Sequence, residues 1–526
     1  MDNMSEFIQR HIGPSESEQR KMLADLGLST IDELVREIVP DSILLRGDSK
    51  LPEGCSEQQA LTELKDIASH NVVKRSLIGQ GYYGTITPPV IQRNVFENPA
   101  WYTSYTPYQA EISQGRLEAL FNYQTLITEL TGLPVANASL LDEGTAAAEA
   151  MLLAHSQSKK KDFIVDDKVF PQTLAVLETR AKPLGINIIK IDFDGSIPIA
   201  FFADAFGVIV QLPNSHGNLR HRNGLLRLAE VCNCMKIAIV DPMAQVLMQP
   251  VGEWGFDIAV GSMQRFGVPM GFGGPHASFF ATTDKYKRKI PGRIVGQSVD
   301  AQGNKALRLA LQTREQHIRR DKATSNICTA QALLANMAGF YAAYHGAEGL
   351  KNIATRILTY REILKKGLTW LGIEVDDTEG FDTIRFKSFL VVEGFNVRYE
   401  DDHTLITLDE LTTLDEIKTL INSQQDLVNQ EDTIDHIVEA VGRYKWENIP
   451  ERTQPWLRQD VFNKYQSETN MMRYINELVS KDFSLVNGMM PLGSCTMKLN
   501  AASELMPVSW NEFANMHPFA PENQTL

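Results

Sequence analysis

Two stretches decide the fold of this chain: Ile237-Ala-Ile-Val-Asp241-Pro, and then Phe256-Asp-Ile-Ala-Val-Gly-Ser-Met-Gln264-Arg-Phe-Gly-Val-Pro-Met-Gly-Phe-Gly-Gly-Pro-His276. Each holds a short apolar run that is closed by a polar residue and flanked by glycine or proline. Such runs are typical of strands buried in a parallel sheet. Ligand sites of open α/β sheets lie beyond the carboxyl ends of the strands, so we expect Asp241 and Gln264 to lie at one site.

Strand-like and helix-like segments alternate around these stretches. We expect strands at 162–165, 186–191, 207–211 and 237–240, and helices at 171–181 and 225–235. This alternation predicts a doubly wound α/β layer with a mainly parallel sheet. An alternative interpretation of Asp241-Pro is a simple turn at the end of a strand.

Length, charge and cysteine content limit the possible classes of protein. A chain of 526 residues is too long for one core, so at least two domains are expected. The net charge of −14 argues against nucleic acid as the main partner. No apolar run approaches the roughly 20 residues of a membrane helix, and the first residues resemble neither a signal nor a transit peptide, so we expect a cytoplasmic protein. The five cysteines show no metal-site spacing, and Cys232 and Cys234 are expected to be packing thiols.

Two further segments suggest binding. Residues 79–89 are rich in glycine and proline and cannot form a regular helix, and an aromatic stretch follows at 101–109. Long aromatic loops of this kind are more often binding loops than spacers, with aromatic packing as the alternative. The second segment is the turn at Gly144 and Thr145, which opens an alanine-rich helix.

These features resemble the aminotransferase fold (fold type I) of pyridoxal phosphate (PLP) enzymes. There, an aspartate in the place of Asp241 pairs with the pyridinium nitrogen, and a lysine on a following strand holds the cofactor as a Schiff base. Gln264 cannot form that imine. A turn like the one at Gly144 would bind the cofactor phosphate, but Asp142 and Glu143 would repel it by several kcal/mol if poorly solvated. We therefore interpret the cofactor site as vestigial and Asp142 as a helix cap.

Several long motifs occur in the order of one family. They are 7–14, 105–115, 261–276, 290–296 and 312–327. Together they resemble the first, lysine-free half of the glycine cleavage system P-protein, the PLP-dependent glycine decarboxylase. That family has two homologous halves, fused or as separate subunits, and only the second carries the Schiff-base lysine. One departure is Val169-Phe170-Pro, where the family usually has Cys-His-Pro, which weakens any acid/base role at that position.

The stretch 486–500 resembles the opening of the second, catalytic half, so relative to fused members the chain is expected to be cut short. The resemblance implies that the loop at 105–109 reaches the PLP site of that half, and PLP is then bound mainly by the missing half. No catalytic residue and no metal ligand is expected in this chain. The expected pocket-lining residues are Tyr105, Thr106, Tyr108, Gln109, Gly493, Ser494, Cys495, Thr496, Lys498 and Asn500, and the expected vestigial ones are Gly144, Thr145, Asp241 and Gln264.

The activity implied by the resemblance is decarboxylation of glycine, with transfer of the aminomethyl group to the lipoyl group of the H-protein. Besides glycine and the H-protein, the expected partners are the missing half or a second copy in a homo-oligomer such as a dimer. The alternative is a non-catalytic scaffold or regulatory subunit that pairs with a separate PLP-bearing chain. Lys498 as the Schiff-base lysine is a weaker rival, because the family uses a later lysine, and an unrelated aminotransferase would need lysine at 264.

The expected domains follow these motifs. Residues 1–75 form an N-terminal helical arm, 76–329 the aminotransferase-like large domain, 330–441 a small α/β domain, and 442–526 a linker and the start of the second half. Arg314, Arg319 and Arg320 either bind an anion or, more in keeping with their setting, form ion pairs between the halves.

Overall fold

The computed structural model describes most of the chain. The described residues are 7, 10, 11, 13–47, 50, 54–103, 107, 109–193, 202–219, 234–314, 316–323, 327, 331–376, 378–389, 391–424, 431–489 and 500–525. Within them, no helix has both the length and the apolar character needed to cross a bilayer.

A seven-stranded sheet forms the centre of the molecule, in the order β2-β8-β7-β6-β5-β3-β4. The five strands from β7 to β4 run parallel, and β8 pairs antiparallel with both β7 and β2. The strands are β2 (Val135–Ala136), β3 (Asp162–Asp166), β4 (Asn187–Ile191), β5 (Ala205–Leu212), β6 (Met235–Val240), β7 (Ile258–Ser262) and β8 (Ser278–Thr282).

Side chains of successive strand residues pack into two different hydrophobic cores, one on each face of the sheet, because side chains alternate between the faces. In β6, Ile237 and Ile239 pack with α8 (Glu143–His155) and α9 (Pro171–Ala181). Ala238 and Val240 pack instead toward α7 (Gln114–Thr131), α11 (Pro242–Leu247) and the long α13 (Ala332–Trp370). Burial on both faces explains why the strands read as continuous apolar runs.

The α/β fold with a mainly parallel sheet is therefore confirmed. Strands β3 to β6 lie where the sequence predicts them, with ends shifted by one or two residues, and α9 has the predicted bounds. The helix predicted at 225–235 is wrong at its end, because Met235 opens β6, and residues 220–233, including Cys232, lie outside the described part. Cys234 is a buried thiol.

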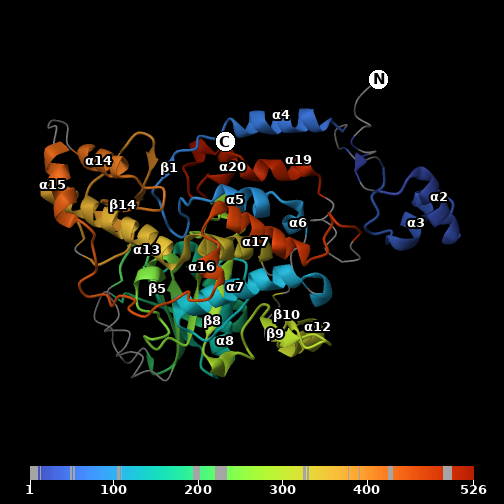
Figure 1. Ribbon diagram of the computed structural model, residues 1–526, viewed down its shortest axis with the longest axis horizontal. Coiled ribbons are helices and arrows are strands. Elements are labelled where there is room, and N and C mark those ends of the chain that lie inside the picture. Colours follow the sequence, from blue (N-terminus) through green and yellow to red (C-terminus); the bar gives the residue numbers. More distant parts are fainter. Residues whose placement is uncertain are drawn as a thin grey trace.

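A second, smaller layer lies beyond α13 and is visible at the left of Figure 1. Its three-stranded antiparallel sheet has the order β11-β14-β13. Its elements are β11 (Thr383–Phe386), β12 (Phe395–Asn396), β13 (Arg398–Glu400), β14 (His403–Thr407), α14 (Leu414–Asn422) and α15 (Glu431–Val441). Strand β1 (Arg75–Ser76) pairs with β12, so the chain touches this layer before it enters the large sheet.

The C-terminal segment and α4 (Glu57–Ala68) pack along the body, whereas the first two described helices stand away from it. Helices α2 (Glu16–Asp25) and α3 (Ile31–Ile38) project at the right of Figure 1, and α4 lies beside the C-terminal segment. Near the C-terminus, α17 packs on α7, and α20 lies near the turn at Gly271. The helices of this region are α16 (Val461–Lys464), α17 (Glu468–Ser480), α19 (Ala502–Leu505) and α20 (Asn511–Ala514).

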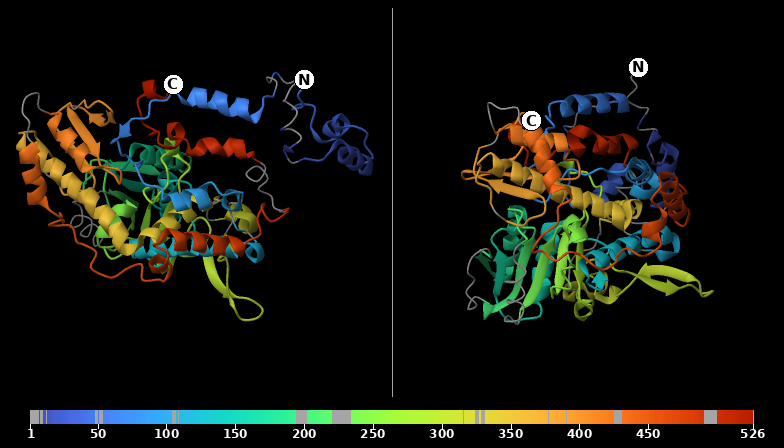
Figure 2. Two further views of the ribbon diagram at one scale, coloured as in Figure 1. Left: turned by 45° about the horizontal axis from the view of Figure 1, so that its top comes forward. Right: turned by 60° about the vertical axis from the view of Figure 1, so that its left-hand side comes forward.

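The remaining described elements are one hairpin and three short helices. The hairpin of β9 (Val295–Val299) and β10 (Lys305–Leu309) extends away from the body in both views of Figure 2. Short helices α5 (Pro89–Ile91), α6 (Pro99–Tyr102) and α12 (Gln316–Arg319) complete the described regular structure apart from single turns. The four domains expected from the sequence stay predictions.

Candidate functional site at the carboxyl ends of β6 and β7

Asp241 ends β6 and caps the next helix. One of its carboxylate oxygens accepts hydrogen bonds from the backbone N–H groups of Met243 and Ala244, at 2.8 and 2.9 Å. The other accepts from Nε of Arg265 at 2.6 Å. The carboxylate is therefore fully used by the chain itself, as a helix cap on one side and as an ion-pair partner on the other.

Gln264 follows β7 and is only 1% exposed. Its side-chain carbonyl accepts from the N–H of Tyr83 at 2.9 Å, and its amide donates to the carbonyls of Tyr83 and Val268, at 2.8 and 2.7 Å. This paired contact fastens the glycine-rich loop around Tyr83 to the end of the sheet. Because a buried amide needs such partners, the polar residue at 264 has a structural explanation.

Arg265 is the centre of the buried charges at this site, with 3% of its surface exposed. Besides Asp241, its guanidinium forms an ion pair with Asp382, and its central carbon lies 3.3 Å from the centre of the Tyr83 ring. Burial opposes the charge, but Asp241 and Asp382 outweigh burial and raise the pKa of Arg265. Burial also raises the pKa of Asp382 above its ordinary value, whereas the adjacent Arg265 guanidinium favours the ionised form.

The turn into α8 carries less negative charge than the sequence suggested. Asp142 caps the helix by accepting from the N–H of Thr145 at 2.7 Å, which confirms its predicted role. Burial raises the pKa of Glu143 to about 8, so this carboxyl is mostly protonated at neutral pH. The repulsion of a phosphate expected from both acids therefore comes mainly from Asp142. A Cβ atom at Gly144 would lie 3.1 Å from the Val176 side chain, so this glycine serves the packing of α8 on α9.

Little space remains between these groups. The pocket bounded by the loop at 81–83, Glu143, Asp241 and the end of β7 holds about 10 Å³, which is room for about one water. The residues present do not fit PLP at this strand end. Gln264 cannot form the imine, Arg265 already pairs with the aspartate that would meet the ring nitrogen, and no volume is left for the ring.

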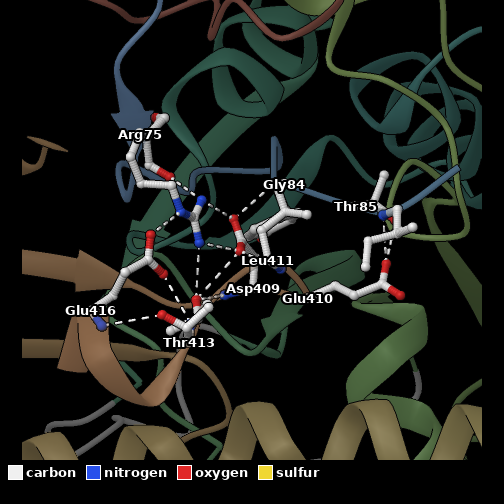
Figure 3. A network of polar contacts seen from close by, with 12 residues as sticks. Arg75, Gly84, Thr85, Asp409, Glu410, Leu411, Thr413 and Glu416 are labelled. Atoms are coloured by element: carbon white, nitrogen blue, oxygen red, sulfur yellow. Dashed lines mark hydrogen bonds and ion pairs between the residues drawn. The ribbon is translucent and has the colours of Figure 1, made fainter. Parts of the chain in front are cut away.

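Two acidic residues that follow β14 also hold the glycine-rich loop, as Figure 3 shows. Asp409 accepts from the N–H of Gly84 at 2.7 Å and is bound by the guanidinium of Arg75. Glu410 accepts from the hydroxyl of Thr85 at 2.8 Å. The loop therefore joins the large sheet to the smaller layer through buried polar contacts.

The C-terminal segment covers the outer side of this loop. Nε2 of His517 lies 3.1 Å from the carbonyl of Gly79, and the ring of Tyr82 meets the edges of His517 and Phe519, with both centroid distances at 5.8 Å. Burial lowers the pKa of His517 to about 4, so the imidazole is neutral. Because Nδ1 accepts from the N–H of Phe519, Nε2 carries the proton and donates to Gly79.

Comparison with known proteins agrees with this arrangement. Residues 9–423 match the glycine cleavage system P-protein family. The chain is 52% identical over 550 residues to a protein from Synechococcus sp. (strain CC9902) named glycine dehydrogenase (decarboxylating), covering 99% of this chain and 56% of the relative. It is 50% identical over 540 residues to a protein of the same name from Aliivibrio fischeri (strain ATCC 700601 / ES114), covering 99% and 55%.

The chain belongs to the glycine cleavage system P-protein family. A crystal structure of a glycine decarboxylase (P-protein) of the glycine cleavage system, in inhibitor-bound form, has the same fold, with a TM-score of 0.72 and 33% identity. That similarity covers 78% of this chain and 98% of the other. The fold type I architecture expected from the resemblance is therefore confirmed. The chain spans about half the length of the curated P-protein relatives it matches.

The two loops predicted to line a pocket are described only in part. Tyr105, Thr106 and Tyr108, and Gly493, Ser494, Cys495, Thr496 and Lys498, lie outside the described residues. Gln109 is exposed, and Asn500 is partly exposed just before α19. These assignments therefore stay predictions.

The described segments that flank the two loops lie side by side. Ile112 accepts from the N–H of Phe483 at 3.0 Å, and Asp482 binds the N–H of Gly115 and the guanidinium of Arg116, both at 2.7 Å. Residues 112–116 and 482–483 thus form one packed unit at the start of α7. One loop precedes this unit in the sequence and the other follows it.

Sequence reasoning did not assign a role to three site residues. They are Tyr83, Arg265 and Asp382. Arg265 directly follows Gln264, so a cation beside the missing lysine was a usable signal. Asp382 carried no such signal, because it reaches the site from the distant start of β11.

Proposed function

We propose that this chain supplies the lysine-free half of a glycine decarboxylase of the glycine cleavage system. One observation carries the proposal: in a chain of the P-protein family, the strand end expected to hold PLP is closed by Gln264 and Arg265. PLP, which acts as an electron sink in such reactions, is then bound mainly by a partner sequence that carries the Schiff-base lysine. The lipoyl H-protein is the proposed acceptor of the aminomethyl group.

The contribution proposed for this chain is made by its loops. The packing of 112–116 against 482–483 supports a common location for the predicted pocket residues at 105–109 and 493–500. Polar and aromatic side chains there would contact the cofactor site of the other half. The vestigial character of Gly144, Thr145, Asp241 and Gln264 is part of the same proposal. The cytoplasmic location and a dimer stay predictions.

Two measurements test the proposal. In the first, the purified chain is incubated with PLP, reduced with borohydride and mapped by mass spectrometry. We expect no specific pyridoxyl-lysine, and a stoichiometric adduct on one lysine, Lys498 included, would contradict the proposal.

In the second, glycine-dependent release of carbon dioxide is assayed with the H-protein and PLP. The chain is used alone and together with a family sequence that consists of the lysine-bearing half without a first half. We expect activity only in the mixture. If the lysine-bearing partner has equal activity without this chain, the chain is a scaffold or regulatory subunit instead.

A further inference from the structure

Three charged side chains form a buried row at the end of the sheet. The side chains of Asp241, Arg265 and Asp382 are 7%, 3% and 1% exposed, and they come from the ends of β6 and β7 and the start of β11. Taking three charges out of water is costly, and a buried ion pair is weak evidence for stability by itself. A row of this kind in the position of a ligand site therefore needs a specific explanation.

The surroundings of the guanidinium have the features of a binding site for a planar cation. Two carboxylates accept its N–H groups, Asp241 from Nε at 2.6 Å and Asp382 from Nη2. Tyr83 lies against its face at 3.3 Å, and the Phe381 ring is 5.6 Å away. Two acceptors in the plane and an aromatic ring on the face are the arrangement that planar cations favour.

A protonated pyridine ring is also a flat cation that pairs with an aspartate at the end of a strand. The Arg265 guanidinium likewise places a planar cation against an aspartate, Asp241, and this cation is a side chain of the protein. The remaining space, about 10 Å³, has room for about one water and not for a pyridine ring.

We propose that Arg265 is a resident substitute for a bound planar cation. Its guanidinium occupies a site made by Asp241, Asp382 and Tyr83, and thereby closes this strand end to a cofactor independently of Gln264. Arg265 fills this site whether or not the chain contributes to glycine decarboxylation. This occupancy has two consequences that can be measured separately.

The first consequence is that an external cation replaces the missing side chain. Arg265→Ala removes the atoms that ethylguanidinium can restore, so low millimolar ethylguanidinium should raise the melting temperature of this variant in a saturable way. At ten times its dissociation constant, the ligand multiplies the folded-to-unfolded ratio about tenfold. Tetramethylammonium carries the same charge without N–H donors and should have no such effect.

The matched control removes the two carboxylates as well. In the triple variant D241N/R265A/D382N, ethylguanidinium should give no saturable shift. If R265A does not fold when expressed, refolding yields with ethylguanidinium and with tetramethylammonium are compared at equal concentration. A higher yield with ethylguanidinium supports the proposal, whereas equal yields, or an equal shift in the triple variant, would overturn it.

The second consequence concerns lysine at position 264. If Arg265 closes the site, Gln264→Lys alone should not bind PLP, because the guanidinium still occupies Asp241. After borohydride reduction, peptide mapping of Q264K should show no more pyridoxyl group at residue 264 than on exposed lysines such as Lys65. A stoichiometric adduct at residue 264 would show that Arg265 does not close the site.

Discussion

Removing the carboxylate of Asp482 should destabilise the junction between the start of α7 and the C-terminal segment. In the folded protein, Asp482 accepts from the N–H groups of Gly115 and Arg116 at 2.7 and 3.2 Å and from the Arg116 guanidinium at 2.7 Å. The side chains of Arg116 and Asp482 are 2% and 4% exposed, so water cannot replace these bonds. Asp482→Ala therefore leaves a guanidinium buried without its carboxylate.

The expected cost follows from these contacts. Breaking a buried pair by removing one partner costs about 3–5 kcal/mol, because the other charge stays uncompensated. Burial already lowers the pKa of Arg116, with Asp482 as the compensating charge. The loss of the two backbone bonds at the helix start is part of the same penalty, and a helix cap alone accounts for about 1 kcal/mol. We therefore expect D482A to lower the free energy of unfolding by about 3–5 kcal/mol.

Equilibrium urea unfolding, followed by circular dichroism, measures this change, and hydrogen exchange locates it at 110–120 and 478–489. The matched control is Lys481→Ala, which removes the partly exposed pair with Glu118 at 2.9 Å and should cost less than about 1 kcal/mol. The double variant R116A/D482A should be less damaging than the sum of the single changes. A cost below about 1 kcal/mol for D482A, equal to that of K481A, would refute the reasoning.

Three further changes have outcomes that the structure specifies. The pKa of Glu143 is raised to about 8 in the fold, so its contribution to stability should fall by up to about 1.4 kcal/mol per pH unit from about pH 4.5 to 8, and Glu143→Gln should remove this contribution in pH-dependent urea titrations. The pKa of His517 is lowered to about 4, so its contribution to stability should be complete above about pH 6.5 and lost as the pH falls toward 4, and His517→Gln should flatten that part of the same profile. A Cβ atom at Gly115 would lie 1.9 Å from the carbonyl oxygen of Leu478, so Gly115→Ala should cost at least about 1–3 kcal/mol in urea unfolding, whereas Gly54→Ala, which meets nothing within 4 Å, should change stability by about 0.5 kcal/mol or less. A pH profile unchanged by either substitution, or equal costs for the two glycine variants, would contradict these expectations.

The sequence predicted the central layer well because its signals are local. Apolar runs such as 237–240, closed by Asp241, are readable without knowledge of the distant chain, and the capping role of Asp142 follows from its position before Gly144. The end of the helix predicted at 225–235 was wrong because the apolar pattern of the sequence continues through Met235 without a turn signal. Met235 belongs to β6 although it continues the apolar pattern.

The content of the site was less predictable because it depends on contacts between distant segments. Gln264 was recognised as unable to form an imine, but its hydrogen bonds to Tyr83 join residues 181 positions apart. The pair of Arg265 and Asp382 joins residues 117 positions apart. The charge of Glu143 was also overestimated, because burial and nearby acids set its pKa, and neither is visible in a short motif.

The strand end closed by Gln264 and Arg265 and the contact between 112–116 and 482–483 both depend on pairs that the protein forms with itself. A polar group at the end of a buried strand must be paired, and in this chain the partners are backbone groups and charges of the protein itself. Without Arg265 or another bound cation, Asp241 and Asp382 would be buried charges without a partner. That arrangement is far more costly than the paired one. The sheet can therefore serve as a rigid support without a cofactor. Separately, the buried pair of Arg116 and Asp482 holds residues 112–116 against 482–483, and these described segments flank in the sequence the loops predicted at 105–109 and 493–500.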